Sequence, residues 1–362
     1  MIKQLKTFTV NVVAGANVAT IGVMLLVGFA DRFDPMSHPF IACLGLAFPV
    51  FLVINLAFLF FWLTFKRRFA LIPIAGYFLA FAPIRVYMPL NMPADMPDSV
   101  IKVLSYNVQS YSGAPRYTDS FDMIYGYLKG CGADIVCLQE DVDSWRGSKT
   151  RLMEIFPYAD TTHVGSTNMN GVGIYTRFPI LKKERIPYAS TGNGSVAYYL
   201  DIGGDTVIVV NNHFESNHLS LEERRMYKEM LKGDVGKDTA RTESKKLIHK
   251  LGEAAGLRAP QADAVHEYIA SHKNYPLIVC GDFNDNPISY TRRVVAEGLT
   301  DCFVATGRGI GLSYNQKGFF VRIDNIMCSD AFEPYNCMVD NSIDASDHYP
   351  ICCWLKKHEK GR

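Results

Sequence analysis

Charged side chains are scarce in the first 98 residues of this 362-residue chain. Only seven Lys or Arg and four Asp lie there, so 30 of the 37 basic and 32 of the 36 acidic residues belong to residues 99–362. The second part is therefore close to neutral, with a formal charge near −2. This balance excludes a surface that is basic throughout, which drives non-specific nucleic-acid binding, although one local basic patch stays compatible with it.

The sequence also lacks a CxxC pair, an internal repeat and a low-complexity tract. It therefore offers no spacing typical of a zinc site or a redox dithiol. Five of its nine cysteines fall in apolar runs, where cysteine usually acts as a small buried hydrophobe: Cys137, Cys280, Cys328, Cys352 and Cys353. Such cysteines fit a reduced compartment better than a disulfide framework.

Two long runs, residues 8–30 and 40–65, contain no charged side chain. Each exceeds the ~20 apolar residues that a helix needs to cross a membrane, so two transmembrane helices are predicted. A cleaved signal peptide is the alternative for the first run, but Asn11, Asn17 and the length of the run argue against it. A buried hydrophobic hairpin would need an apolar partner surface, and residues 99–362 show none.

A third apolar run, residues 69–90, is interrupted by Pro73 and Pro83. It also holds Arg85, whose charge would have to reach the edge of the membrane. We count it as a further helix. The prediction is thus a transmembrane region over residues 1–91 with two to three helices, which anchors the chain in a lipid bilayer.

The basic residues of this region indicate its orientation. Lys3 and Lys6 precede the first run, and residues 66–68 (KRR) follow the second, whereas the loop over residues 31–34 holds one Arg. Because Lys and Arg favour the cytoplasmic side, three spans place the following domain on the non-cytoplasmic side, and two spans place it in the cytoplasm. The first arrangement is our prediction, although the cysteine usage favours the second.

Residues 92–99 (MPADMPDS) are predicted to form a linker, and residues 100–358 a catalytic domain. Apolar runs typical of strands alternate there with helical stretches: VIKVLSYN, DIVCLQE, GVGIYTR, SVAYYLDI, TVIVVNNH, PLIVCGDFN, FFVRIDNIM and PICCWL. This alternation predicts a mixed α/β fold of about eight strands. The long polar stretch between His213 and Asp282 is expected to form an outer helix pair that packs on a sheet, with residues 215–218 bordering the site.

Polar side chains follow the ends of several predicted strands. Asn107, Glu140, His213 and the pair Asp282 and Asn284 all occupy such positions. One such residue alone is usually a solvent-exposed polar residue or part of a turn. Several strand ends can converge on one rim of a sheet, however, so the set predicts a single polar site. Its oxygen-rich side chains favour Mg²⁺ or Mn²⁺ over zinc.

Two further polar segments, residues 322–325 (RIDN) and 346–350 (SDHYP), complete an ordered set with SYN, LQE, GVGIYTRFPI, NNH and GDFND. This set resembles the deoxyribonuclease-I-like endonuclease/exonuclease/phosphatase superfamily, and it covers essentially all of residues 99–362. The resemblance implies a four-layer α/β sandwich, in which two packed mixed sheets are flanked by helices. Asn325 departs from the aromatic residue that many members carry, which bears on substrate stacking rather than on chemistry.

The resemblance also implies a role for each matching residue. Members hydrolyse phosphoester bonds with a divalent metal, so Glu140 is expected to be the principal Mg²⁺ ligand, assisted by Asn107 and Asp347. Asp282 would accept the proton of the attacking water, and Asn284 would hold that water or a phosphoryl oxygen. The remaining roles are a phosphate contact for His348, its orientation by Asp324, a leaving-group contact for His213, and support or substrate contacts for Asn211 and Arg322.

The sequence thus predicts a membrane-anchored, Mg²⁺-dependent phosphohydrolase that cleaves phosphodiester bonds in the manner of a nuclease, with nucleic acid or phospholipid as its phosphoester substrate. A sphingomyelinase-like lipid phosphodiesterase and an inositol-phosphate phosphatase are the alternatives, because the shared motifs identify the reaction and not the leaving group. A membrane-tethered protein that binds a phosphorylated ligand without turnover is the non-enzymatic alternative. No protein partner is predicted.

Overall fold

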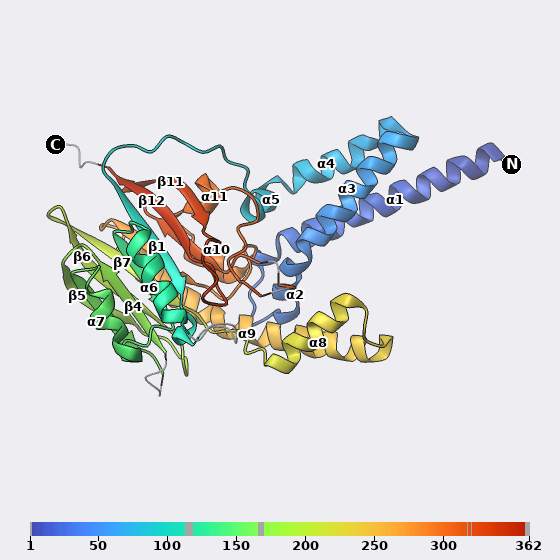
Figure 1. Cartoon of the computed structure of the whole chain (residues 1–362). Helices are drawn as coiled ribbons and strands as arrows, with labels where there is room; N and C mark the ends of the chain where they lie inside the picture. Colours follow the sequence, from blue (N-terminus) through green and yellow to red (C-terminus); the bar gives the residue numbers. More distant parts are fainter. Residues whose placement is uncertain (1, 113–118, 166–169, 317, 320, 359–362) are drawn as a thin grey trace.

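A computed structural model describes residues 2–112, 119–165, 170–316, 318–319 and 321–358 (Figure 1). Its N-terminal helices are α1 (Ile2–Gly28), α2 (Pro39–Leu44), α3 (Phe48–Phe65), α4 (Leu71–Leu79) and α5 (Phe81–Tyr87). Helices α1, α3 and α4 lie against one another and project away from the sheets. Two helical stretches, Gln4–Gly28 and Pro39–Phe65, are long and apolar enough to cross a membrane, which agrees with the first two predicted spans.

The third apolar run forms two helices instead of the one expected over residues 69–90. Helices α4 and α5 meet at an angle of 62°. Pro83 explains the break, because its ring would clash with the Leu79 carbonyl in a continuous helix. Pro73 causes no break, since it lies in the first turn of α4, where backbone N–H groups have no partner within the helix.

Asparagines inside the apolar helices bond to one another. Asn17 of α1 donates from Nδ2 to Asn55 Oδ1 on α3 at 3.1 Å, and it accepts a hydrogen bond from Trp62 Nε1 at 3.1 Å. Asn55 in turn donates to the carbonyl of Pro73 on α4 at 3.0 Å. Both asparagines are fully buried. These bonds join α1, α3 and α4 and satisfy the buried amides, which explains why Asn17 lies in an uncharged run.

The rest of the chain forms two six-stranded sheets. One has the strand order β11-β12-β1-β2-β4-β3 and the other β5-β6-β7-β8-β10-β9. The strands of the first sheet are β1 (Val100–Asn107), β2 (Ile135–Gln139), β3 (Tyr158–His163), β4 (Gly171–Thr176), β11 (Phe332–Val339) and β12 (Ile351–Lys357). Those of the second are β5 (Ile180–Ile186), β6 (Gly194–Ile202), β7 (Asp205–His213), β8 (Leu277–Asp282), β9 (Thr300–Asp301) and β10 (Asp324–Cys328).

The sheets pack face to face and helices cover their outer faces, which confirms the predicted four-layer sandwich (Figure 1). Alternate residues of a strand supply the two layers of core: Val103 faces the other sheet, whereas Leu104 faces the outer helices. The covering helices are α6 (Ser120–Gly130) and α7 (Ser148–Leu152) on the first sheet, and α9 (Lys237–Ser271) and α10 (Tyr290–Val295) on the second. The short helix α11 (Cys302–Thr306) precedes β10.

The expected helix pair between β7 and β8 is present, but only part of it packs on the sheet. The C-terminal half of α9 does so through Ala262, Val265 and Ile269. Helix α8 (Leu221–Lys232) has no buried residue and extends away from the sandwich with the first turns of α9. A capping box at Ser220 and Glu223 starts α8.

The N-terminal helices pack directly on the sandwich. Ile288, which follows β8, belongs to the same buried cluster as Met24 and Phe48. Gly45 lies so close to Ile288 that an added Cβ would be 2.6 Å from its carbonyl oxygen. Arg293 of α10 donates from Nε to the Asp31 carbonyl at 2.9 Å. Residues 92–98 form neither helix nor strand, yet the two parts of the chain share one core at this contact.

Candidate active site

Four of the predicted side chains meet where strands of the two sheets end. In the first sheet β1 and β2 are parallel, and in the second β7 and β8 are parallel, so their carboxyl ends lie at one rim. Asn107 donates from Nδ2 to Glu140 Oε1 and to Asp282 Oδ2, both at 3.1 Å, and thereby links the two sheets. His213 Nε2 lies 3.8 Å from Glu140 Oε1 and 3.9 Å from Asp282 Oδ2.

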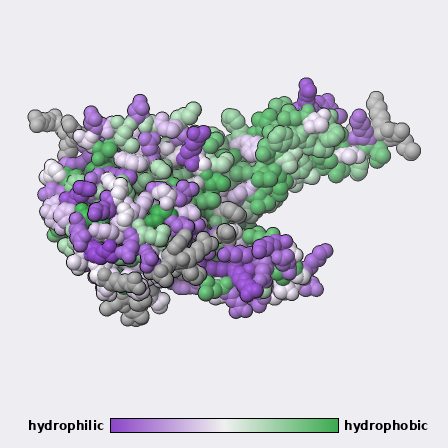
Figure 2. All heavy atoms as spheres, viewed as in Figure 1, coloured by the Kyte–Doolittle hydropathy of each residue, from purple (hydrophilic) through white to green (hydrophobic). Residues whose placement is uncertain are grey.

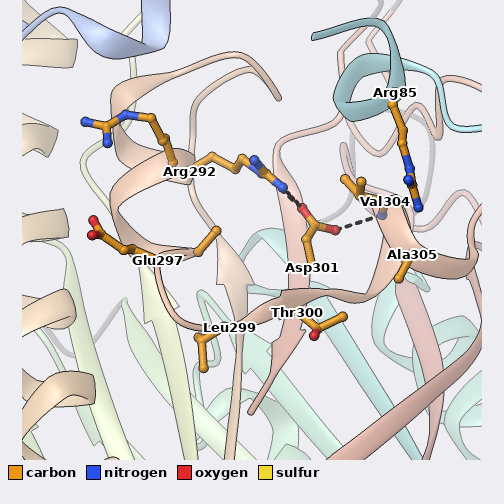
Figure 3. Close-up of a pocket in the computed structure, with 10 residues that line it drawn as sticks. Arg85, Arg292, Glu297, Leu299, Thr300, Asp301, Val304 and Ala305 are labelled. Carbon is orange, nitrogen blue, oxygen red and sulfur yellow. Dashed lines mark hydrogen bonds and ion pairs between the residues drawn. The ribbon is translucent and has the colours of Figure 1, made fainter. Parts of the chain in front are cut away.

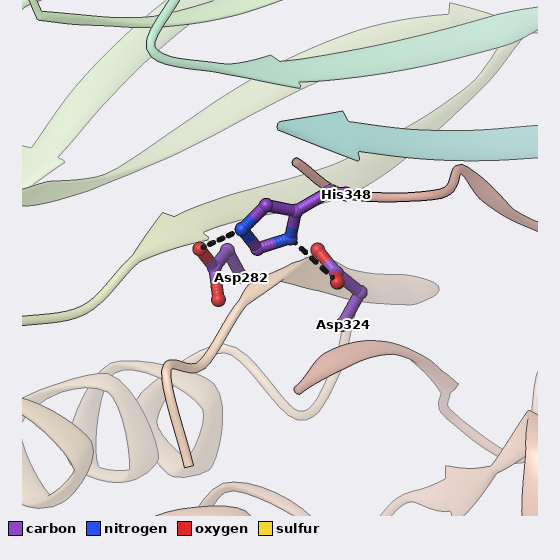
Figure 4. Close-up of side chains that lie close together, drawn as sticks. All are labelled: Asp282, Asp324 and His348. Carbon is purple, nitrogen blue, oxygen red and sulfur yellow. Dashed lines mark hydrogen bonds and ion pairs between the residues drawn. The ribbon is translucent and has the colours of Figure 1, made fainter. Parts of the chain in front are cut away.

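His348 lies between two buried carboxylates at the same rim (Figure 4). Its Nδ1 is 2.9 Å from Asp324 Oδ2, and its Nε2 is 3.6 Å from Asp282 Oδ2. The sheet register explains this arrangement, because β8 and β10 are antiparallel and pair Asp282 directly with Asp324. Burial opposes a charged imidazole, but the two carboxylates outweigh it and raise the pKa of His348 to about 10.

Asp282 is fixed by the residue two positions later. Its Oδ1 accepts a hydrogen bond from the Asn284 backbone N–H at 2.8 Å, and its Oδ2 accepts one from Asn284 Nδ2 at 3.2 Å. Asn284 can do this because its backbone is left-handed, with φ of 53°, a conformation that Asn tolerates. Burial raises the pKa of Asp282 to about 6, opposed by His348 and His213.

Glu140 shares the left-handed backbone, with φ of 55°, which is unusual for this residue type. Its side chain is 31% exposed, so it faces solvent more than the other acids of the rim. Burial, followed by the nearby carboxylate of Asp347, raises its pKa. A strained backbone conformation persists only where the surrounding structure holds it in place. Residues in such conformations are concentrated at functional sites.

Most of the sandwich matches a known protein family. A family model described as "Endonuclease/Exonuclease/phosphatase family" matches residues 104–348, more than half of the chain. The chain belongs to the endonuclease/exonuclease/phosphatase family. A second model, a domain of unknown function, matches residues 10–87. No curated protein matches the chain.

Solved structures of this family share the fold at low sequence identity. A Bacteroides thetaiotaomicron endonuclease/exonuclease/phosphatase family protein is 17% identical, with a TM-score of 0.51, over 72% of this chain and 98% of that one. The human Nocturnin catalytic domain, solved with a bound sulfate anion, is 15% identical, with a TM-score of 0.52, over 74% and 97%. A humanized D. rerio TDP2 is 18% identical, with a TM-score of 0.51, over 72% and 100%.

Asp347 borders the rim from the loop before β12. Its Oδ2 lies 3.8 Å from Arg224 Nη1, and its backbone N–H donates to Gln109 Oε1 at 3.2 Å. Arg224 in turn faces the ring of Tyr314, whose centroid lies 5.3 Å from that of His348. Arg224 and Tyr314 are absent from the predicted set. The position of Arg224, at the start of a helix just after the strand that ends at His213, could have indicated that it borders the site. No pattern in the sequence indicates this for Tyr314.

Asn211 lies one layer behind the rim. It is fully buried between the sheets, where its Oδ1 accepts a hydrogen bond from Gln139 Nε2 at 2.7 Å. Its Nδ2 donates to the carbonyls of Leu138 and Gly173 at 3.0 and 2.8 Å. All of its polar groups are thus bonded between the sheets, so Asn211 can support the rim but cannot contact a substrate.

Arg322, expected to contact the substrate or to support the site, is not brought to the rim. Its guanidinium points toward the N-terminal helices and donates to the carbonyls of Val86 and Ile310, both at 2.8 Å. It also packs over the ring of Phe303 at 4.2 Å. In a strand, successive side chains point to opposite sides, so the direction of each can be predicted from its position. Arg322 lies before β10 in irregular backbone, where this rule does not apply.

The residue types at the rim fit a divalent cation. Burial and, after it, the nearby carboxylate of Asp347 raise the pKa of Glu140, and a cation held by both carboxylates would relieve their repulsion. Asn107 presents its NH₂ to the carboxylates, while its Oδ1 accepts from the Gln109 backbone, so the amide would have to turn over to bind a cation. The carboxylate oxygens of Glu140 and Asp347, and the Asn107 amide oxygen once it is turned, are donors of the kind that Mg²⁺ prefers.

A second group of potential ligands consists of Asp282, Asp324 and His348, whose ligand atoms lie within 4.8 Å of one another. The hydrogen bond between His348 Nδ1 and Asp324 Oδ2 already accounts for two of these atoms. A hydrogen-bonded His–Asp pair of this kind can hold a phosphate or move a proton, whereas the carboxylates on the Glu140 side of the rim can hold a cation.

Proposed function

We propose that the chain is a membrane-anchored, divalent-metal-dependent phosphohydrolase that cleaves phosphodiester bonds by attack of water, in the manner of a nuclease. The observation that carries the proposal is the position of His348 between Asp282 and Asp324, opposite Glu140 at the same rim. A phosphodiester is anionic, so this rim offers it a cationic ring, a carboxylate base and an oxygen-rich cation site. Membership in the endonuclease/exonuclease/phosphatase family supports hydrolysis of a phosphoester bond.

The proposed mechanism gives each side chain one task. His348, held as an imidazolium by Asp324, donates a hydrogen bond from Nε2 to a phosphoryl oxygen. Asp282 accepts a proton from the attacking water, since burial keeps it a stronger base than an exposed Asp. A bound Mg²⁺ or Mn²⁺, held by Glu140 and Asp347, would neutralise charge on the phosphate.

His213 and Asn284 complete the set. Burial lowers the pKa of His213, so its ring is neutral near pH 7 and offers one N–H to the leaving oxygen. Asn284 donates from Nδ2 to Asp282 Oδ2 and to the Phe214 carbonyl, and it orients the base. In this scheme Asp324 acts through His348 and is a positioning residue.

The arrangement of the apolar helices supports the anchoring part of the proposal. On the face shown in Figure 2, the projecting N-terminal helices are almost entirely hydrophobic, whereas α8 and the adjoining part of α9 are hydrophilic. The N-terminus lies at the end of α1 far from the sandwich, as does the turn between α3 and α4 that carries residues 66–68. Both basic segments thus lie on the same side, which favours a cytoplasmic location for them and a non-cytoplasmic one for the catalytic domain.

A lipid phosphodiesterase is the second candidate. The contact of Ile288 with the apolar helices holds the sandwich next to the membrane, and Ile288 follows Asn284 by only four residues. A rim so close to a bilayer favours a substrate that resides there. The reaction chemistry would be the same, and only the leaving group would differ.

The substrate class is tested with the full-length chain in detergent, because Ile288 belongs to the core of the N-terminal helices. Plasmid DNA, single-stranded RNA, sphingomyelin and inositol phosphates are incubated with Mg²⁺ or with EDTA. His348→Ala is compared with His249→Ala, a matched change at a histidine whose side chain is 75% exposed. We expect cleavage of one class that requires Mg²⁺ and His348 but not His249.

Cleavage of nucleic acid alone would support the proposal of a nuclease, and cleavage of sphingomyelin alone would support a lipid phosphodiesterase instead. Equal activity of His348→Ala and wild type would contradict the assignment of the rim. Tight binding of a phosphorylated compound by a folded chain that cleaves nothing would replace the enzyme by a binding protein.

A further inference from the structure

A pocket of about 450 Å³ lies away from the rim, where α5 meets α10 and α11. Three arginines line it: Arg85, Arg292 and Arg293. Figure 3 shows Arg85 reaching down from α5 toward Ala305, while Arg292 approaches Asp301 from the opposite side. The pocket thus lies at the junction between the apolar helices and the sandwich, and none of the proposed catalytic side chains lines it.

Positive charge in this pocket exceeds the negative charge that faces it. Arg292 is neutralised, since its Nε and Nη2 donate to Asp301 Oδ2 at 2.9 and 2.5 Å. Arg85 is exposed and takes part in no ion pair within the described part of the chain. The carboxylate of Glu297 points away from both Arg85 and Asp301 (Figure 3). Arg85 is therefore a charge without a counterion among the residues that the structure describes.

Arg293 is only partly satisfied by the protein. Its Nε donates to the Asp31 backbone carbonyl, and its guanidinium lies 5.3 Å from the ring centroid of Tyr290. The carboxylate of Asp31 lies near enough to interact with Arg293, but no hydrogen bond joins these two side chains in the described part of the chain. Among the described residues, nothing accepts a hydrogen bond from the Nη groups of Arg293, so Arg293 and Arg85 can both still donate to an anion.

The position of the pocket relative to the apolar helices points to the source of that anion. Arg85 lies in the last turn of α5, seven and four residues after two large side chains that are strongly exposed, Phe78 at 85% and Phe81 at 63%. An arginine at the end of an exposed apolar segment places its guanidinium at the level of lipid phosphates. The pocket opens beside that segment.

We propose that this pocket binds the phosphate headgroup of an anionic phospholipid from the membrane that holds the apolar helices. The proposal rests on the membrane anchoring given under the proposed function, but not on the catalytic assignment. Arg85 and Arg293 bind the phosphate, and the exposed apolar side chains of α4 and α5 contact the acyl chains. A bound lipid then holds the sandwich against the bilayer at a second point besides the helix contacts.

The experiment uses the full-length chain in a zwitterionic detergent with EDTA present, so that no lipid is hydrolysed. Phosphatidylglycerol or phosphatidylcholine is added, and native mass spectrometry counts the lipids that stay bound. Arg85→Gln and Arg293→Gln are compared with Arg68→Gln, an arginine in the turn between α3 and α4 that does not line the pocket. Inorganic phosphate is added as a competitor in a separate arm.

We expect one phosphatidylglycerol to bind in preference to phosphatidylcholine. Arg85→Gln and Arg293→Gln should each weaken it by about fivefold, as expected for one arginine at a lipid surface. Arg68→Gln should leave it unchanged, and phosphate should not displace it.

Equal binding of the two lipids, or equal loss in Arg85→Gln and Arg68→Gln, would overturn the proposal. Displacement by millimolar phosphate would show a site for a free anion instead. Extraction of membranes with alkaline carbonate tests the anchoring separately. A chain that resists extraction but shows no lipid preference refutes only the pocket, whereas a chain released by carbonate refutes the anchoring.

Discussion

At the scale of single residues, two neighbouring carboxylates determine the orientation and the charge of the His348 ring. Asp324 holds Nδ1 by a hydrogen bond, so only Nε2 is available to a substrate. Asp282 lies on that side and keeps the ring charged. The same Asp282 is bonded by Asn107 and Asn284, so that one carboxylate joins three of the predicted side chains.

Asp324→Asn tests the positioning role. The amide keeps the shape of the side chain but removes the charge that favours the imidazolium, so we expect kcat to fall by about 10²- to 10⁴-fold, the usual contribution of one acid–base group. KM should change little. Asp330→Asn, at an exposed turn in the same part of the chain, is the matched control. A kcat within twofold of wild type would remove Asp324 from the mechanism, provided that the circular dichroism spectrum is unchanged.

The sequence predicted the members of the rim better than it predicted their neighbours. Asn107, Glu140, His213 and Asp282 follow apolar strands, and strand ends are recognisable from hydrophobicity alone. Tyr314 lies in irregular backbone and reaches His348 only because the chain folds back between α11 and β10. Contacts of that kind depend on the path of a loop, which local sequence does not encode.

At the scale of secondary structure, buried pairs tie the elements of the sandwich together. Arg292 of α10 binds Asp301 of β9, and Asp301 also accepts the Val304 backbone N–H at the start of α11. Burial opposes the charge on Asp301, but Arg292 and Arg322 outweigh it and lower its pKa. Since the folded-state pKa lies below the unfolded one, the pair stabilises the fold above about pH 4 and loses its effect as the pH falls below that.

Asp301→Asn should therefore lower the free energy of unfolding by about 3–5 kcal/mol at pH 7, because it leaves Arg292 buried without a counterion. The variant should also lose less stability than wild type when the pH is lowered from 7 to 3. Denaturant unfolding of the detergent-solubilised chain at both pH values measures this. Asp122→Asn breaks an exposed pair with Arg151 and should cost about 1 kcal/mol or less. Equal pH dependence of Asp301→Asn and wild type would contradict the prediction.

Gly45 provides a test of the contact between α2 and the sandwich. Gly45→Ala would place a Cβ 2.6 Å from the Ile288 carbonyl oxygen, and backbone on both sides leaves little room to adjust. We expect a loss of about 1–3 kcal/mol in unfolding free energy, typical of overpacking. Gly15→Ala, where nothing lies within 4 Å, should be neutral or slightly stabilising. Equal stability of the two variants would show that the helices do not pack on the sandwich as described.

The strands that the sequence missed show the limits of hydrophobic patterns. β5 (Ile180–Ile186) and β3 (Tyr158–His163) lie at the edges of their sheets and carry mostly polar or exposed side chains, so they lack the apolar run of a central strand. β9 has only two residues, and β11 is mostly half-buried. The run FFVRIDNIM was expected to be extended throughout. Its residue 320 lies outside the described residues, residues 321–323 form no strand, and β10 begins at Asp324. Central strands were predicted correctly because burial on both faces leaves a clear signal, and the two long apolar helices because their runs contain no charged side chain.

At the scale of the whole molecule, the apolar helices are part of the folded unit and not a loose tether. Ile288 packs among them, Arg322 binds the end of α5, and Asn91 donates to the carbonyls of Val304 and Gly307. The path of the chain brings residues 66–68 and the N-terminus to the side away from the sandwich. Charge distribution and helix packing are thus both compatible with the three crossings that we propose.

The orientation can be measured in bacterial spheroplasts that produce the full-length chain. Added protease should cleave the exposed turn between α8 and α9, around Gly233 and Gly236, in intact spheroplasts, because three crossings place it outside. Replacement of residues 66–68 by neutral residues should weaken this preference. Cleavage only after lysis would put the catalytic domain in the cytoplasm and agree with the nine free cysteines.

The central claim is that the rim of the sandwich hydrolyses phosphodiesters, and a simple diester tests it without a choice of natural substrate. The measurement is hydrolysis of bis(p-nitrophenyl) phosphate by the full-length chain, wild type and Asp282→Asn, with Mg²⁺ and with EDTA. We predict turnover by wild type with Mg²⁺ only, and a rate lower by at least about 10²-fold in Asp282→Asn, because the base is lost. Turnover that survives both EDTA and the Asp282→Asn change would contradict the account.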